Sequence, residues 1–414
     1  MNEKVILVGV ETEENYRYFE SSMDELRGLT KTADGEIVFI LKQKRPQIDR
    51  QTILGKGKLE ELKQLVIAHE ADLVIFNHEL SPRQAQLLAE TLEVKMLDRV
   101  QLILDIFALR ARSKEGKLQV ELAQLEYLLP RLAGQGSQLS RLGGGIGTRG
   151  PGETKLETDR RHIRNKITQI KHELKEVAAH RLRARKQRQN KNIFQLGLIG
   201  YTNAGKSTIL NILTSAQTYE QDQLFATLDP LTKKWRMPEG FEVTVTDTVG
   251  FIQDLPTQLV DAFHSTLEES KEVDMLLHVV DAHAKDRLQH EQTVADLMQQ
   301  LGIIDIPILT IYNKADLIDE EQFIPTLFPN VCISAKSNKG KEDLIRAIKQ
   351  QLMEQFEPYL VEVKAVDANQ LYEIKRQTLV TNITFEEETQ IYQVAGFAPT
   401  YHPFVRMITD QEFE

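Results

Sequence analysis

The first hundred residues alternate short apolar runs with stretches of helical periodicity. The apolar runs have the length and composition of buried strands, and they lie at residues 5–8, 37–40, 73–76 and 94–97. Helical stretches lie between them at 16–29 and 58–69, and the sequence SPRQ at 81–84 is typical of a capped helix start. This alternation predicts a small parallel α/β domain over residues 1–97.

Residues 98–191 carry two apolar stripes of helical spacing. The stripes repeat at alternating intervals of four and three residues, and they consist of Leu118, Leu122, Leu125, Leu129 and Leu132, then Ile163, Ile167, Ile170, Leu174 and Val177. They predict an antiparallel helical hairpin, whose second helix would be about 50 Å long between residues 156 and 190. We expect one interruption of the helical region, at residues 133–152, which hold eight of the chain's 22 glycines.

Two further regions follow the hairpin. Residues 192–356 contain more apolar runs and helical stretches, and we expect the last helix of this region at 340–355. Residues 361–366 and 390–394 alternate apolar and polar positions like half-exposed strands, with a helix between them at 367–376. We therefore expect a small α+β domain over residues 357–414.

The loop at residues 200–208, GYTNAGKST, matches the phosphate-binding pattern G-x-x-x-x-G-K-[ST]. It follows an apolar run at 193–199 and precedes a helical stretch, which is the strand–loop–helix context that this motif requires. We expect its backbone to wrap the nucleotide phosphates, Lys206 to reach the β- and γ-phosphates, and Ser207 to bind Mg²⁺. The candidate contacts are Gly200, Tyr201, Thr202, Asn203, Ala204, Gly205, Lys206, Ser207 and Thr208.

A second motif indicates which base the nucleotide carries. The sequence Asn313-Lys314-Ala315-Asp316 directly follows an apolar run. The carboxylate of Asp316 suits guanine, which offers two donors, N1–H and the 2-amino group, whereas adenine would leave the carboxylate unpaired. The triplet Ser334-Ala335-Lys336 follows another short apolar run and resembles the last guanine-binding loop of translation-factor-type GTPases.

The segment Asp247-Thr248-Val249-Gly250 looks like the D-x-x-G motif of the same class of proteins. In that motif the aspartate, here Asp247, holds Mg²⁺ through a water, and the glycine N–H, here of Gly250, contacts the γ-phosphate. With four motifs in the expected order, the sequence predicts a Mg²⁺-dependent GTPase that binds GTP and GDP. Lys206 and Gly250 are candidate catalytic groups.

The charge of the chain is unevenly distributed. The whole chain has a net charge of −10. Residues 141–191 carry 15 Lys and Arg against 5 Asp and Glu, which gives this segment a net charge of +10 and the rest of the chain a net charge of −20. A basic segment on an acidic body is typical of proteins that bind a polyanion such as RNA, although a solvated helix face has the same composition. The glycine-rich segment 133–152 has three interpretations, which are a linker, a second nucleotide loop, and a nucleic-acid contact at the tip of the hairpin; we favour the last.

Composition places further limits on the chain. It holds one cysteine, Cys332, which excludes a disulfide within these residues. No apolar run approaches the ~20 residues of a membrane-spanning helix, and the first residues lack the pattern of a signal peptide. We therefore expect a cytoplasmic protein without a membrane span, and we expect it to be a monomer.

Three stretches together resemble the HflX family of ribosome-associated GTPases. They are GGGIGTRGPGETKLETDRR at 143–161, GYTNAGKST at 200–208 and FATLDP at 225–230, and the resemblance extends over the whole chain. It implies that the N-terminal half binds the large ribosomal subunit and its RNA, with the glycine-rich tip near the peptidyl-transferase region. It also implies that the GTP-bound protein splits stalled ribosomes under heat or antibiotic stress, and that hydrolysis releases it.

The resemblance also assigns roles to residues. Within the segment Phe225, Ala226, Thr227, Leu228 and Asp229, it makes Thr227 the residue that coordinates Mg²⁺ and closes over the γ-phosphate, a third candidate catalytic group. Together with the charge pattern, it places the RNA contacts at Arg141, Gly143, Gly144, Gly145, Arg149, Arg160 and Arg161.

One residue departs from the pattern of Ras-type GTPases. Phe251 stands where those enzymes carry the glutamine that orients the attacking water, and an apolar side chain cannot hydrogen-bond that water. We expect slow intrinsic hydrolysis and stimulation by the ribosome. Asn203 resembles the asparagine of potassium-activated GTPases, so K⁺ is a second candidate cofactor, with a turn-forming asparagine as an equal interpretation. The alternative function is a signalling switch whose hairpin binds a protein partner, another RNA or an anionic membrane surface.

Overall fold

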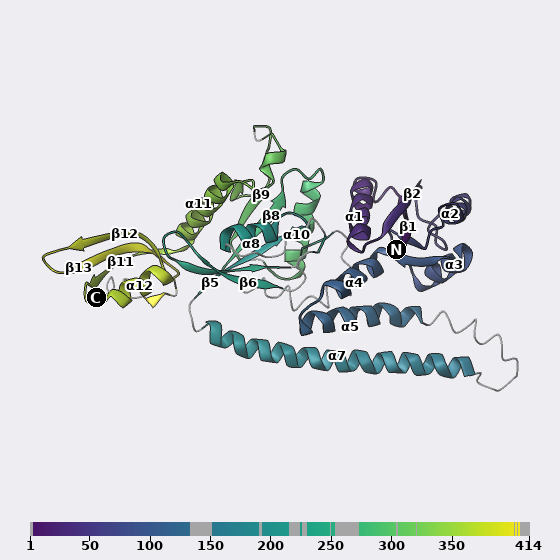
Figure 1. Cartoon of the computed structure of the whole chain (residues 1–414), viewed down its shortest axis with the longest axis horizontal. Coiled ribbons are helices and arrows are strands. Elements are labelled where there is room, and N and C mark those ends of the chain that lie inside the picture. Colours follow the sequence, from purple (N-terminus) through teal and green to yellow (C-terminus); the bar gives the residue numbers. More distant parts are fainter. Residues whose placement is uncertain are drawn as a thin grey trace. The chain divides into compact units, whose positions relative to one another are not determined.

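The computed structural model describes residues 3–132, 151–189, 193–214, 224–225, 230–248, 250–252, 273–303, 305–319, 321–400, 402–403 and 405; of residues 151–156 and 180–189 it describes only the backbone. The chain divides into two compact units. One contains residues 1–179, 221–229 and 252–265, and the other contains residues 180–220, 230–251 and 266–414. The fold is α/β, as the sequence predicts, with a parallel sheet in the first unit and a mostly parallel sheet in the second (Figure 1).

A four-stranded parallel sheet forms the N-terminal part of the first unit. Its strands are β1 (Lys4–Glu11), β2 (Glu36–Lys44), β3 (Leu73–Phe76) and β4 (Lys95–Asp98), in the order β2-β1-β3-β4. Helices α1 (Phe19–Thr32), α2 (Lys56–His69) and α3 (Pro82–Leu92) connect them. Each strand overlaps an apolar run that the sequence assigns to a strand, and β3 is buried throughout, as in a sheet covered on both faces. The capping box predicted at Ser81 and Gln84 is present.

The predicted helical hairpin is formed by α5 (Lys114–Arg131) and α7 (Pro151–Gln189). The two helices pack through the predicted stripes, where Leu118, Leu122, Leu125 and Leu129 meet Ile163, Ile167, Ile170 and Leu174 (Figure 1). Ion pairs flank this contact, between Lys166 and Glu121 (3.2 Å) and between Lys171 and Glu126 (2.7 Å).

Two expectations about the helical region were wrong. A further helix, α4 (Arg99–Arg110), precedes α5, and the chain breaks between them because the Ser113 hydroxyl accepts a hydrogen bond from Gly116 N and caps α5. Helix α7 begins at Pro151 rather than at residue 156, since proline suits the first position of a helix. Residues 133–150 of the glycine-rich segment lie outside the described residues.

A six-stranded sheet forms the centre of the second unit. Its order is β10-β9-β8-β5-β7-β6, and β6 runs antiparallel to β7 while the other neighbours are parallel. The strands are β5 (Phe194–Gly200), β6 (Leu231–Arg236), β7 (Glu242–Asp247), β8 (Met275–Asp281), β9 (Ile308–Asn313) and β10 (Asn330–Cys332). The helices are α8 (Lys206–Thr214), α10 (Arg287–Gln300) and α11 (Asn338–Gln355), with a short 3-10 turn at Ala315–Leu317. Helix α11 confirms the helix predicted at 340–355.

A small α+β region ends the chain, as predicted. Strands β11 (Glu357–Lys364), β12 (Leu379–Glu386) and β13 (Ile391–Ala398) form an antiparallel sheet in the order β11-β13-β12, and α12 (Ala368–Gln377) packs against it. The sequence did not predict β12.

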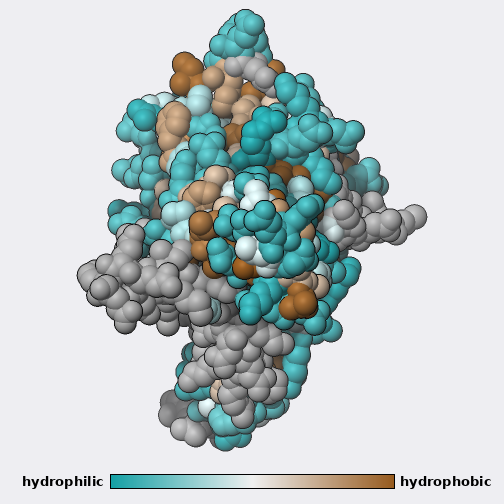
Figure 2. Space-filling model, turned by 90° about the vertical axis from the view of Figure 1, so that its left-hand side faces the viewer, coloured by the Kyte–Doolittle hydropathy of each residue, from teal (hydrophilic) through white to brown (hydrophobic). Residues whose placement is uncertain are grey.

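The face seen in Figure 2 is largely hydrophilic, with hydrophobic residues scattered over it. Among the described helices, none combines the length and apolar character that a bilayer crossing requires.

Candidate nucleotide-binding site

The phosphate-binding loop joins the end of β5 to the start of α8, as the motif requires. Two of its glycines have backbone conformations that favour glycine, with φ of +149° at Gly200 and +101° at Gly205. Neighbouring atoms also exclude a side chain, because a Cβ would lie 2.2 Å from Val279 O at Gly200 and 2.3 Å from Asn313 Nδ2 at Gly205. These two positions therefore let the loop turn tightly against β8 and β9.

Lys206 is the first residue of α8 and is buried at 6% exposure. Its ammonium group donates to the carbonyl oxygens of Gly200 (3.1 Å) and Tyr201 (2.9 Å). Burial lowers the pKa of Lys206 to about 8, an effect that the nearby carboxylate of Asp247 opposes. The lysine is thus held over the loop whose phosphate ligand it was predicted to contact.

Ser207 and Asp247, the predicted Mg²⁺-binding residues that the structure describes, lie side by side. The Ser207 hydroxyl donates to Asp247 Oδ2 at 2.8 Å, and Asp247 is buried at the end of β7. A hydroxyl and a carboxylate at this separation form an oxygen donor set, which suits a hard cation such as Mg²⁺. The residues present therefore fit the ion that the family implies.

The segment after Asp247 passes close to the loop. The Thr248 hydroxyl donates to Leu198 O (2.6 Å), and a Cβ at Gly250 would lie 3.0 Å from Lys206 Nζ. Phe251 is fixed by its backbone, since its N–H donates to Gly200 O (3.1 Å) and its carbonyl accepts from Thr202 N (2.7 Å). Its side chain is only 2% exposed. The residue at the position of the water-orienting glutamine is thus part of the core.

The guanine motifs come together at the ends of β9 and β10. The side chain of Asn313 donates from Nδ2 to Ala204 O (3.0 Å) and accepts at Oδ1 from Ala335 N (3.0 Å). The Asp316 carboxylate is exposed and accepts from the Ser334 hydroxyl (2.5 Å), which lowers the pKa of Asp316. Asn313 therefore ties the phosphate loop to the Ser334–Lys336 loop, and Asp316 is the carboxylate left facing outward.

Three side chains of this site were not found by sequence reasoning. Asp281 pairs with Lys314 of the guanine motif at 2.7 Å. His290 of α10 stacks on Tyr201 of the phosphate loop, with ring centroids 3.8 Å apart, and burial lowers the pKa of His290. His278 of β8 is buried, and this burial together with Lys206 lowers the pKa of His278 to about 4. No motif signals these residues, because the fold alone brings them to the loop.

The other predicted site residues divide into two groups. Phe225 belongs to the first unit, is buried, and contacts Phe107 of α4 edge-to-face at a centroid distance of 4.5 Å. Arg160 is half-buried and Arg161 is exposed on α7. The remaining predicted contacts lie outside the described residues, namely Arg141, Gly143, Gly144, Gly145, Arg149, Ala226, Thr227, Leu228, Asp229 and Val249.

Family models and sequence relatives agree along the chain. Three family models match, described as GTP-binding GTPase N-terminal (residues 20–108), GTP-binding GTPase Middle Region (110–188) and 50S ribosome-binding GTPase (195–314). GTPase HflX of Alkalihalophilus pseudofirmus is 52% identical over 399 residues, covering 96% of this chain and 94% of the relative. GTPase HflX of Escherichia coli is 42% identical over 338 residues, covering 80% and 79%. The crystal structure of SsGBP with GDP is 26% identical with a TM-score of 0.47, covering 84% of this chain and 98% of that one.

Proposed function

Because the chain is a GTPase that belongs to the HflX family, we propose that it works on the large ribosomal subunit and splits stalled ribosomes under stress. The description of its GTPase domain as ribosome-binding supports this partner. The basic helix α7, on which Arg161 and Arg164 are exposed, supports contact with ribosomal RNA, because such side chains neutralise phosphates. We expect a monomer that acts in the cytoplasm.

Each group of the site has a proposed role in hydrolysis. Lys206 would offset negative charge on the β- and γ-phosphates, and Gly250 would offer its N–H to the γ-phosphate. Ser207 and, through a water, Asp247 would hold Mg²⁺ together with Thr227; the ion would neutralise charge that develops on the phosphate oxygens. Asp316 would select guanine by accepting from its two donors.

The observation that carries the dependence on a partner is the position of Phe251. Its side chain is buried and its backbone is bonded to Gly200 and Thr202, so residue 251 offers no polar group to the attacking water. A GTPase without such a group hydrolyses GTP slowly until a partner orders the site or supplies the missing group. We propose that the large ribosomal subunit is this partner.

The test compares GTP hydrolysis by the full chain alone and with purified large ribosomal subunits. We expect the turnover rate to rise by at least roughly tenfold, since completing such a site in other GTPases gives larger effects. A second test sediments the protein with intact ribosomes on a sucrose gradient. With a non-hydrolysable GTP analogue, the protein should travel with the large subunit and the intact-ribosome peak should shrink. With GDP, neither change should occur. Equal turnover with and without subunits, or no sedimentation in either state, would reject the proposal.

A pair of matched variants separates RNA binding from binding of a protein partner. Arg161→Glu reverses a charge on α7, and Lys364→Glu makes the same change at an exposed site of β11. We expect only the first to weaken subunit binding and to reduce its salt dependence. Equal effects of the two variants would argue against an RNA contact at α7 and leave the alternative, a switch that binds a protein. Turnover in KCl and NaCl at equal ionic strength tests the K⁺ role of Asn203; equal rates would remove it.

A further inference from the structure

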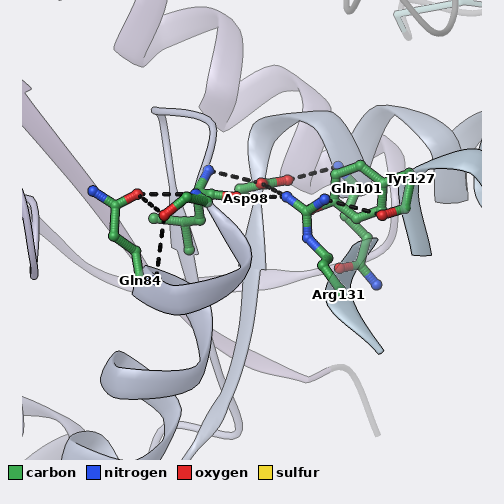
Figure 3. A network of polar contacts seen from close by, with 7 residues as sticks. Gln84, Asp98, Gln101, Tyr127 and Arg131 are labelled. Carbon is green, nitrogen blue, oxygen red and sulfur yellow. Dashed lines mark hydrogen bonds and ion pairs between the residues drawn. The ribbon is translucent and has the colours of Figure 1, made fainter. Parts of the chain in front are cut away.

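The last turn of α5 is fastened to the N-terminal sheet by a buried polar network (Figure 3). Asp98 stands at its centre, because it is both the last residue of β4 and the N-cap of α4. Arg131 reaches it from the end of α5. Leu132 is the last described residue before the glycine-rich segment, so the network lies directly at the base of that segment.

The carboxylate of Asp98 is fully buried and accepts from three directions. Its Oδ1 accepts from Gln101 N (2.9 Å), and its Oδ2 accepts from Leu80 N (2.9 Å) and from Arg131 Nη2 (3.2 Å). Two backbone amides and one guanidinium thus compensate the charge. Because the donors come from the β3–α3 connection, α4 and α5, one side chain joins three parts of the first unit.

Arg131 uses both ends of its guanidinium group. Its Nη2 also donates to Leu80 O (2.5 Å), its Nη1 donates to Tyr127 O (3.1 Å), and its central carbon lies 3.4 Å from the centre of the Tyr127 ring. The side chain is 16% exposed. A lysine has one point of charge and no planar fork, so it could not make these contacts together.

The network lies on the face of α5 that the hairpin leaves unused. Leu118, Leu122, Leu125 and Leu129 pack against α7, whereas Val120, Ala123 and Tyr127 form a second buried stripe, and α5 contacts α3 and α4. Arg131 follows Tyr127 by one helical turn and continues this second stripe. Apolar contacts therefore hold the middle of α5, and directed polar contacts hold its end.

A buried ion pair contributes little net stability compared with apolar residues of the same shape, because both charges lose their water. What the pair provides here is direction, since Arg131 bonds Asp98, Leu80 O and Tyr127 O at the same time. We propose that Arg131 is a positioning residue, which fixes the end of α5 on Asp98 and Leu80 and so holds in place the point from which the glycine-rich segment continues. This inference rests on the proposed function, in which the chain binds the large ribosomal subunit, and on the expectation that the glycine-rich segment contacts ribosomal RNA.

A first experiment needs no ribosome. Hydrogen exchange of the full chain is compared between the wild type, Arg131→Met and Arg131→Lys, with Lys117→Met as a control that removes an exposed charge from the same helix. We expect exchange at residues 126–132 to rise by roughly tenfold in the Met variant, as for the loss of a charge-assisted hydrogen bond, and to rise less in the Lys variant. Unchanged exchange in both Arg131 variants would overturn the inference.

A second experiment reads where the segment lies. Cys332→Ser removes the single cysteine, Ser137→Cys adds one within the segment, and a tethered iron chelate then cleaves nearby ribosomal RNA. With wild-type Arg131 we expect discrete cleavage sites on the large subunit. Arg131→Met and Arg131→Lys should spread or move these sites, whereas loss of stability alone would only weaken them.

The outcomes separate the two proposals. If the chain with wild-type Arg131 does not bind or cleave the subunit, the proposed function fails and the inference falls with it. If the wild type cleaves, and folded Arg131→Lys cleaves the same sites with the same intensity, the function stands and the inference is wrong. The Lys variant keeps the charge, which leaves the test open even if Arg131→Met does not fold.

Discussion

Replacement of Asn313 by alanine tests whether this residue holds the site together or reads the base. Its side chain is 3% exposed and makes two hydrogen bonds of 3.0 Å, to Ala204 O and from Ala335 N. Asn313→Ala leaves both backbone groups buried without this partner, at roughly 1–3 kcal/mol each. We therefore expect the two loops to lose on the order of 2–6 kcal/mol of local stability together.

The assay is hydrogen exchange of the full chain at the amide of Ala335, read from a peptide that spans the Ser334–Lys336 loop. A local loss of even 2 kcal/mol corresponds to roughly thirtyfold faster exchange where opening is local. Asp316→Asn is the matched control, because Asp316 is exposed and its side-chain partner is the nearby Ser334. We expect it to leave exchange at Ala335 almost unchanged while lowering the preference for GTP over xanthosine triphosphate.

Either of two results would refute this reasoning. If Asn313→Ala weakened GTP binding but left exchange at Ala335 as in the wild type, the amide would act on the nucleotide and not as a connection between loops. If Asp316→Asn increased exchange as much as Asn313→Ala, the division of roles between the two residues would be wrong.

Three further predictions concern groups around Lys206. Gly250→Ala places a methyl group 2.9 Å from Thr202 Cγ2 and 3.0 Å from Lys206 Nζ, at a cost of about 1–3 kcal/mol. In fluorescence titrations this variant should lose more affinity for GTP than for GDP. Equal losses for the two nucleotides would contradict this prediction. The pKa of Lys206 is lowered to about 8, and bound phosphates favour the charged form of this lysine. GTP binding should therefore be coupled to the uptake of a proton and should weaken as the pH rises above 8. Calorimetry in two buffers of different ionisation enthalpy measures this uptake, and its absence would contradict the prediction. The pKa of His278 is lowered from 6.5 to about 4 in the folded chain. Between these two pH values the unfolded chain binds a proton at His278 that the folded chain does not bind. The free energy of unfolding should therefore fall as the pH drops through this window, by at most about 1.4 kcal/mol per pH unit. Thermal midpoints of His278→Gln should depend less on pH over this window than those of the wild type, and an unchanged dependence would reject the assignment.

The elements that the sequence predicts well are those whose signal is local. The strand–loop–helix context at Gly200–Ser207, the heptad stripes of α5 and α7 and the capping box at Ser81 each depend on residues a few positions apart. The missed strand β12 has a physical explanation, because its pairing with β13 shifts register between Val380 and Asn382 and interrupts the alternation of buried and exposed positions. The break before α5 had a local signal in Ser113, but the apolar periodicity on both sides obscured it.

The contacts that the sequence could not predict are those made to backbone atoms from far along the chain. Asn313 bonds Ala204 O, 109 residues away, and Arg131 bonds Leu80 O, 51 residues away. A sequence motif identifies side chains, whereas every residue carries the same backbone carbonyl oxygen. The carbonyl that accepts a given hydrogen bond can therefore be identified only from the folded structure.

The carbonyl oxygen of Gly200 shows why this matters for function. It accepts both from Lys206 Nζ (3.1 Å) and from Phe251 N (3.1 Å), so one backbone atom joins Lys206, the proposed phosphate contact, to the segment that carries Gly250. A movement of Phe251 would therefore alter the hydrogen bonding of Lys206 without any change in the side chains that the motifs name. A partner that reorders this segment would therefore act on Lys206 through a backbone acceptor, without a polar side chain at position 251.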